Sequence, residues 1–330
     1  MRTTLTELLA TGRVLLADGA TGTNYFAAGL ASGEPPEFWT VDRPEEVTGL
    51  HRRFVDAGAD IILTNTFGCN PHRLKLHNAQ QRTYELARRA AELARSVADA
   101  ASRPVVVAGS VGPTGELFEP MGRLTHAAAV ASFTAELEGL RDGGADVAWI
   151  ETMSSAEEVN AAAEAAIAVG LPYVVTYSFD TAGRTMMGLL PRAAAATVAG
   201  QPVPPLALGA NCGVGAPDIL VSLVQMRDAP FPLVTKGNCG VPHFVGTEAV
   251  YSGTPQLMAR YARLAIDGGA RIIGGCCGTT PEHLAAMRAS IDAHERGEQP
   301  TLDTIIEKIG PLTNPAPAEH AERPTRRSRR

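Results

Sequence analysis

A short segment occurs three times in the sequence, at residues 56–60, 142–146 and 267–271. Each copy reads aspartate, alanine or glycine, glycine, alanine and a charged residue, and each lies between a helix-like stretch and an apolar run. A glycine just past a helix adopts the left-handed backbone that ends it, and a β-branched run favours a strand. Each copy is therefore predicted to join the end of a helix to the start of a buried strand.

Eight apolar runs of this kind occur along the chain: residues 14–18, 61–65, 105–109, 147–151, 173–177, 206–211, 233–237 and 271–275. They lack the alternation of polar and apolar residues, which is typical of parallel strands buried on both faces. Successive starts lie roughly 25 to 50 residues apart, enough for a helix and two loops. The pattern predicts an α/β fold, a single-domain TIM (β/α)8 barrel. A doubly wound open sheet is the alternative, but no Gly-x-Gly-x-x-Gly motif follows the first run.

The segment between the first two predicted strands is a helix preceded by a long loop. Asp42 is the predicted N-cap of this helix, and Gly58 is its predicted end. Residues 29–40 form the loop, where Phe38 and Trp39 are predicted to be exposed and to cover the mouth of the barrel. The alternative for these two side chains is packing onto the rim of the barrel.

Composition limits the class of protein. The chain has 330 residues, of which 45% are hydrophobic, so it can bury a sizeable core. The net charge of −6 argues against nucleic acid as a partner. No apolar run approaches the ~20 residues of a membrane span, and no signal peptide is recognisable, so we expect a cytoplasmic protein that does not bind membranes. We expect residues 1–310 to form the barrel and residues 311–330, rich in proline and arginine, to form a disordered basic tail.

Cysteines stand where predicted strands end. Cys276 and Cys277 lie between glycines after the last run, and Cys212 follows the run 206–211. Adjacent cysteines cannot form an ordinary unstrained disulfide with each other. Because alternate strands contribute to one layer of a barrel, these three thiols can converge on one Zn²⁺ ion with a fourth position left for substrate. The alternative is that the cysteines are simply small buried hydrophobic residues.

Other potential ligands are less well placed in the sequence. Cys69 and Cys239 lie at strand ends but have no cysteine neighbour, so we do not expect them to bind the metal. His243 could complete a closed, structural four-ligand site, which is the alternative to an open one.

Two carboxylates end otherwise apolar runs. Asp18 follows the first run, and Glu151 ends the fourth. A carboxylate is costly to bury unless it meets a cation or hydrogen-bond donors. An amino group on the substrate would satisfy both.

These motifs resemble those of the zinc-dependent homocysteine S-methyltransferases, over a stretch from about residue 14 to about residue 294. The matching segments are residues 18–23 (DGATGT), 64–67 (TNTF), 112–113 (GP), 151–152 (ET), 211–212 (NC) and 274–283 (GGCCGTTPEH). The combination of Asn-Cys with Gly-Gly-Cys-Cys is highly specific. The loop pattern is most similar to that of bacterial betaine-type enzymes.

The resemblance implies the roles of several residues. Cys212, Cys276 and Cys277 would hold one zinc ion, and the thiol of homocysteine would take the open position. Asp18, Gly19 and Glu151 would hold the amino acid end of homocysteine.

The function that follows from the resemblance is zinc-dependent transfer of a methyl group from glycine betaine to L-homocysteine, giving L-methionine and dimethylglycine. An onium donor binds against aromatic faces, and we expect Trp39 to supply one, with Phe67 beneath it and with Phe38 and Tyr25 nearby. S-methylmethionine is the alternative donor. A non-catalytic zinc- or thiol-binding protein is the alternative of another class. The expected partners are small-molecule substrates, and a homo-oligomer is left open.

Overall fold

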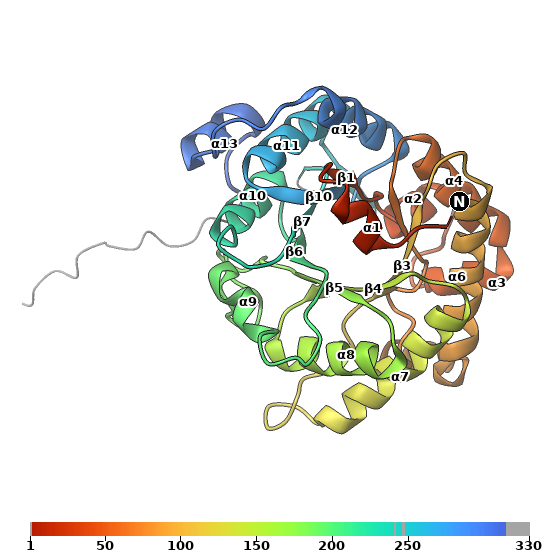
Figure 1. The fold of residues 1–330 in the computed structure, drawn as a ribbon. Helices are drawn as coiled ribbons and strands as arrows, with labels where there is room; N and C mark the ends of the chain where they lie inside the picture. The colour runs from red at the N-terminus through yellow and green to blue at the C-terminus, as the bar shows by residue number, and fades with distance from the viewer. Residues whose placement is uncertain (1, 241, 246–247, 315–330) are drawn as a thin grey trace, which may run out of the picture.

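The computed structural model describes residues 2–240, 242–245 and 248–314, and contains a parallel barrel surrounded by helices (Figure 1). Eight strands pair in the order β1, β10, β7, β6, β5, β4, β3, β2, and a bridge between Ala17 and Ile61 joins the two ends of this order. The strands are β1 (Leu15–Leu16), β2 (Ile61–Leu63), β3 (Val106–Val111), β4 (Val147–Met153), β5 (Tyr173–Tyr177), β6 (Ala207–Cys212), β7 (Leu233–Gly237) and β10 (Ala270–Gly275). The predicted TIM barrel is confirmed, and the open sheet is wrong.

Most of the helices follow a strand and lie outside the barrel, whereas α1 precedes the first strand and lies across one end of the barrel (Figure 1). They are α1 (Leu5–Ala10), α2 (Gly22–Ala27), α3 (Trp39–Asp42), α4 (Pro44–Asp56), α5 (Pro71–Leu74), α6 (Thr83–Ala100), α7 (His126–Asp142), α8 (Ala156–Val169), α9 (Ala194–Thr197), α10 (Ala216–Gln225), α11 (Pro255–Asp267), α12 (Pro281–Ala293) and α13 (Leu302–Ile309). An antiparallel pair, β8 (Pro242–Val245) and β9 (Glu248–Tyr251), follows β7. Within the described ranges, no helix has the length and apolar character needed to span a membrane.

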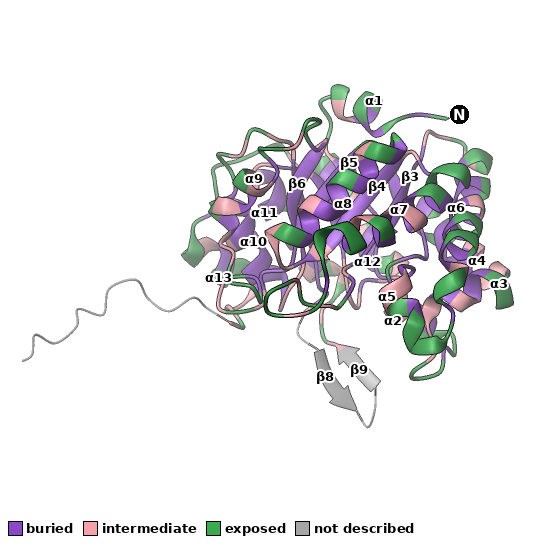
Figure 2. Ribbon diagram, turned by 90° about the horizontal axis from the view of Figure 1, so that it is seen from below, coloured by how far each residue is buried: buried purple, intermediate pink, exposed green. Residues whose placement is uncertain are grey.

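The hydrophobic core has two layers. One lies between the strands and the outer helices, and the other fills the inside of the barrel. Leu5 and Leu8 of α1 belong to the inner layer together with Val106, Trp149 and Val234. Helix α1 therefore closes the end of the barrel where the strands begin, and this leaves the opposite end for a site (Figures 1 and 2).

The repeated segment has the predicted local structure. Helices α4, α7 and α11 each end at the aspartate that opens a copy. The central glycines, Gly58, Gly144 and Gly269, have φ angles of 106°, 96° and 99°. A β-carbon at such angles is strained, which explains why all three copies have glycine there.

The last residue of the repeat has a role that the sequence did not predict. The Asp60 amide donates to the Leu16 carbonyl at 2.7 Å, and the Leu16 amide donates to the Asp60 carboxylate at 2.9 Å. Asp146 makes the same pair of bonds with Val107, at 2.8 Å and 2.9 Å. Each aspartate thus clamps the start of its strand to the neighbouring strand.

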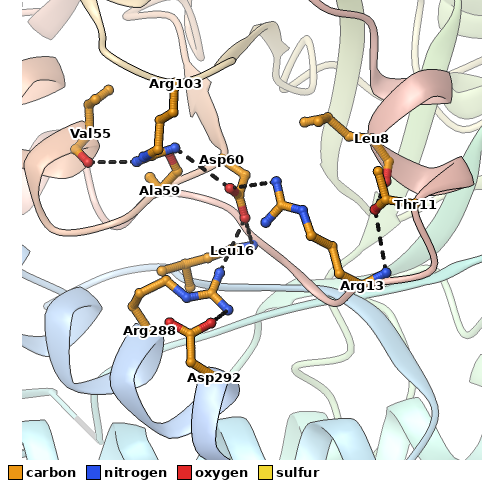
Figure 3. A network of polar contacts seen from close by, with 10 residues as sticks. All are labelled: Leu8, Thr11, Arg13, Leu16, Val55, Ala59, Asp60, Arg103, Arg288 and Asp292. Atoms are coloured by element: carbon orange, nitrogen blue, oxygen red, sulfur yellow. Dashed lines mark hydrogen bonds and ion pairs between the residues drawn. The ribbon is translucent and has the colours of Figure 1, made fainter.

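Three arginines converge on Asp60, whose residue surface is 3% exposed (Figure 3). The guanidinium nitrogens of Arg13, Arg288 and Arg103 lie 2.9 Å, 3.3 Å and 3.6 Å from its carboxylate oxygens. Arg103 also donates to the Ala59 carbonyl at 2.8 Å. Both oxygens of this buried carboxylate are therefore compensated, as a stable buried charge requires.

One detail of the predicted connections is wrong. Asp42 does not cap the first long helix, because Pro44 takes the first helical position and Arg43 the cap, while Asp42 ends α3. The predicted tail, residues 311–330, begins with residues that contact α10. The backbone amides of Thr313 and Asn314 each donate to the Asp218 carboxylate at 3.0 Å. Residues 315–330 of that tail lie outside the described residues.

Candidate active site

Side chains along a strand alternate between the two faces of the sheet, so every second residue points into the barrel. Trp149 and Val234 point into the barrel. Glu151 and Lys236 stand two residues further along the same strands and face the same interior, near the carboxyl ends where barrel enzymes place their sites. A cavity of about 560 Å³ lies there, and both side chains line it.

The three predicted metal ligands come together at this cavity. The Cys212 and Cys277 sulfurs are 4.0 Å apart, and the sulfurs of Cys212, Cys276 and Cys277 all lie within 4.8 Å of one another. Sulfurs bound to one tetrahedral zinc ion at ~2.3 Å are about 3.8 Å apart. The cluster therefore fits a soft divalent metal ion with little movement.

The remaining candidate ligands do not join this cluster. Cys69 and Cys239 are fully buried, and neither belongs to the metal-sized group of ligand atoms found among the described residues. The side chain of His243 lies outside the described part of the chain, so the closed four-ligand alternative stays a prediction.

Asn238 connects the two loops that carry the cysteines. Its side-chain oxygen accepts a hydrogen bond from the Cys277 amide at 3.1 Å, and its side-chain nitrogen donates to the Gly213 carbonyl at 2.9 Å. The Cys276 amide donates to the Gly237 carbonyl at 2.8 Å. Sequence reasoning assigned no role to Asn238. Its position directly after a buried run was the available signal.

The backbone is strained at two points of the site. Cys212 and Thr152 have φ angles of 61° and 62°, in the left-handed region that side chains other than glycine rarely adopt. Asn211 holds Thr152 there, because its side-chain oxygen accepts from the Thr152 amide at 2.8 Å and its nitrogen donates to the Thr152 hydroxyl at 2.7 Å. Such conformations cost on the order of 1–3 kcal/mol and cluster at functional sites.

The thiols differ in their tendency to ionise. Hydrogen bonds from Cys212 and Cys276 lower the pKa of Cys277 to about 3. The hydrogen bonds that Cys212 makes to the other two thiols, together with their charges, raise the pKa of Cys212. One thiolate is thus favoured, and its charge opposes the next. A bound cation would remove this opposition and hold all three as thiolates.

Glu151 lies beside the cluster and is 7% exposed. Its carboxylate accepts a hydrogen bond from the Ser110 hydroxyl at 2.5 Å, and the Asn211 side-chain nitrogen is 3.5 Å from its other oxygen. Burial raises the pKa of Glu151 to about 7, although the charge of Lys236 partly offsets this. A cationic group of a substrate would stabilise its ionised form.

Asp18 is placed differently from the expectation. One of its oxygens accepts from the Leu63 amide at 2.7 Å, and the other accepts from the Lys236 ammonium at 2.8 Å. Asp18 does not line the cavity, whereas the neighbouring Gly19 does. The protein thus supplies the cation that we expected from the substrate. A lysine inside the apolar run 233–237 was the signal that sequence reasoning missed.

The predicted aromatic lid is wrong in its main residue. Trp39 is 1% exposed and belongs to the layer between strands and helices, where its ring centroid lies 5.1 Å from that of Tyr25. Neither ring lines the cavity. Phe38 is half-buried and packs against His77, with ring centroids 6.1 Å apart. Phe67 does line the cavity and is 40% exposed.

Comparisons with known proteins place this chain in a family. The homocysteine S-methyltransferase family model matches residues 15–291, which include the cysteine cluster and both carboxylates. The chain belongs to the homocysteine S-methyltransferase family.

Relatives of this homocysteine S-methyltransferase family member include longer proteins. The methionine synthases of Mycobacterium leprae and Mycobacterium tuberculosis are each 31% identical to it, over 90% and 87% of this chain. The chain spans about a quarter of the length of these relatives (26% and 25%). The metallated homocysteine methyltransferase MmuM from Escherichia coli has a similar structure, with a TM-score of 0.74 and 27% identity over 86% of this chain and 99% of that one.

Proposed function

We propose that this protein transfers a methyl group to the thiol of L-homocysteine, giving L-methionine, and that it uses one zinc ion held by Cys212, Cys276 and Cys277. The observation that carries the proposal is a three-thiol cluster at a cavity that also contains an ionisable carboxylate and an ammonium group. A metal storage site would have no need for the latter two. Bound zinc would supply a substrate thiolate at neutral pH.

The residues of the chain position the substrate for this reaction. Glu151 would bind the α-ammonium group of homocysteine, with Ser110 holding the carboxylate in place through its hydroxyl. The strained Cys212 backbone and the Asn238 bridge would keep the sulfurs oriented toward the cavity.

The proposed methyl donor is glycine betaine. The deprotonated sulfur of homocysteine would form a bond to one methyl carbon, the carbon–nitrogen bond would break, and its electron pair would stay on the nitrogen of dimethylglycine. The thiol proton would go to solvent. Phe67 and Phe26, which line the cavity, are the aromatic faces available to the ammonium methyl groups.

S-methylmethionine is a second candidate because of three further charged or acidic side chains that line the cavity. Arg73 lines it together with Glu34 and Glu37. A cation and two carboxyl groups could bind the carboxylate and ammonium ends of an amino acid donor, and betaine has no ammonium hydrogens for such contacts. The burial of Trp39 also removes the aromatic face expected to favour betaine.

The experiment is an assay of purified, metal-analysed protein with homocysteine and each donor in turn. We expect one equivalent of zinc and methionine formation with betaine. If methionine forms with S-methylmethionine but not with betaine, the donor is S-methylmethionine, and homocysteine remains the methyl acceptor. Zinc binding without turnover with either donor would favour the non-catalytic zinc- or thiol-binding protein.

A further inference from the structure

Lys236 lies inside the barrel, where a neighbouring glycine leaves room for its side chain. It lies on β7 between Asn211 of β6 and Gly274 of β10, and it is 2% exposed. A β-carbon at Gly274 would come within 3.0 Å of the Lys236 side chain, so the absence of a side chain there makes room for the lysine stem. The Lys236 ammonium is 5.8 Å from the centroid of the Trp149 ring.

The ammonium group has unused hydrogen-bonding capacity. A lysine ammonium carries three donors. Among the described residues, Lys236 makes one side-chain hydrogen bond, to Asp18 at 2.8 Å. Lys236 and Glu151 both line the cavity, and no ion pair joins them within the described chain. The cavity thus contains a cation and a carboxylate that do not neutralise each other directly.

We propose that Lys236 binds the α-carboxylate of the amino acid substrate, while Glu151 binds its α-ammonium group. The inference rests on the proposed function, because it takes homocysteine as the ligand. A zwitterionic amino acid brings a carboxylate into the cavity, and without a nearby cation that carboxylate would be repelled by Asp18, Glu151 and the thiolates. Lys236 is the cation at the end of the cavity where these groups lie. Its remaining donors supply charge-assisted hydrogen bonds.

The rival explanation is that Lys236 only compensates the buried charge of Asp18. The two roles can be separated with Lys236→Met and with the double variant Asp18→Asn/Lys236→Met, which leaves no unpaired charge behind. Lys308→Met, an exposed lysine on α13, is the matched control. Zinc-loaded proteins are titrated calorimetrically with homocysteine and with 3-aminopropane-1-thiol, which has the same thiol and amine but no carboxylate.

We expect Lys236→Met to weaken homocysteine binding by roughly ten-fold or more, and to change binding of the carboxylate-free thiol by less than about two-fold. The double variant keeps the same loss, and it decides the question if the single variant does not fold. Equal weakening of both ligands, or recovery of homocysteine affinity in the double variant, would overturn the proposal.

The calorimetric readout does not depend on catalysis. Homocysteine binding by the wild type without methionine formation would overturn the proposed activity alone. Absence of homocysteine binding by the wild type would overturn both.

Discussion

Two buried carboxylates at opposite ends of the barrel, Asp60 and Glu151, differ in how far the protein compensates their charge. Where the strands begin, Asp60 is bonded to the Leu16 amide and surrounded by three arginines (Figure 3). Where the strands end, Glu151 has one hydroxyl donor and a more distant amide, and burial raises its pKa to about 7. The first carboxylate is compensated by the protein itself. The second is left able to bind a cation from outside.

The difference between the two carboxylates shows how one fold can place stabilising groups and ligand-binding groups at separate ends. A fully compensated charge network contributes to folding but has no capacity for a ligand, whereas an incompletely compensated group costs stability and gains a binding function. Helix α1 closes the first end (Figure 2). The cavity opens at the second end. Substitutions at the two ends should therefore have separable effects.

The largest effect is expected at the open end. Replacing Cys212, Cys276 or Cys277 by alanine should abolish zinc retention and methyl transfer, because two thiolates and the remaining groups of the cavity cannot hold the ion at an open site. Metal analysis after dialysis and a methionine assay measure this. Cys69→Ala is the control, since Cys69 lies outside the cluster. A metal-free variant with full activity would refute the role of the cluster.

The next effect belongs to the closed end. Asp60→Ala should lower the free energy of unfolding by about 3 kcal/mol, because it leaves the buried Leu16 amide without its acceptor and removes the partner of three partly exposed arginines. Urea unfolding followed by circular dichroism measures the loss. Asp292→Ala is the control, because that side chain is 64% exposed and should contribute less than about 1 kcal/mol. Weaker homocysteine binding by folded Asp60→Ala would contradict the separation of the two ends.

Glu151→Gln should weaken homocysteine binding by about 1.5–3 kcal/mol while zinc is retained. Because burial raises the folded-state pKa of Glu151 to about 7 from an ordinary value of 4.5, the wild type should bind more tightly as pH rises through about 7. The variant should lack this step. Calorimetric titrations between pH 6 and 8 test both points, and an unchanged pH profile would remove Glu151 from the ammonium site.

The same pKa shift predicts a change in stability of the opposite sign. The folded-state pKa of Glu151 is raised, so the folded protein favours the protonated form of this carboxyl group. The stability that comes from this preference is present below the ordinary pKa of 4.5 and is lost as pH rises through about 7. Without ligand, the wild type should lose stability relative to Glu151→Gln over this range. Thermal melts of both proteins between the ordinary pKa of 4.5 and a pH just above 7 measure the difference.

The smallest effect concerns the donor. Phe67→Leu should raise the KM for the donor by the equivalent of ~0.5–1 kcal/mol, as for a partly exposed cation–π contact, and leave homocysteine affinity unchanged. Trp39→Phe is the matched control and should not change the donor KM, since Trp39 does not line the cavity. A larger effect at Trp39 than at Phe67 would restore the sequence-based assignment.

Local patterns in the sequence were sufficient for the architecture. The glycines of the repeat determine where three helices end, and uniformly apolar runs determine the strands, since both depend on residues close together in the chain. Parallel strands bring their carboxyl ends to one side, so the meeting of Cys212 with Cys276 and Cys277 also followed from the order of the runs.

Side-chain partners across the barrel were decided only by the tertiary structure. Asp18 and Lys236 are 218 positions apart, and nothing in either local sequence identifies the other as its counter-ion. Trp39 sits in a loop by its sequence, yet its ring is buried against Tyr25 because the surrounding segment packs onto the barrel. Local sequence selects a backbone conformation, whereas burial and ion pairing depend on which surfaces meet after the strands close into a barrel.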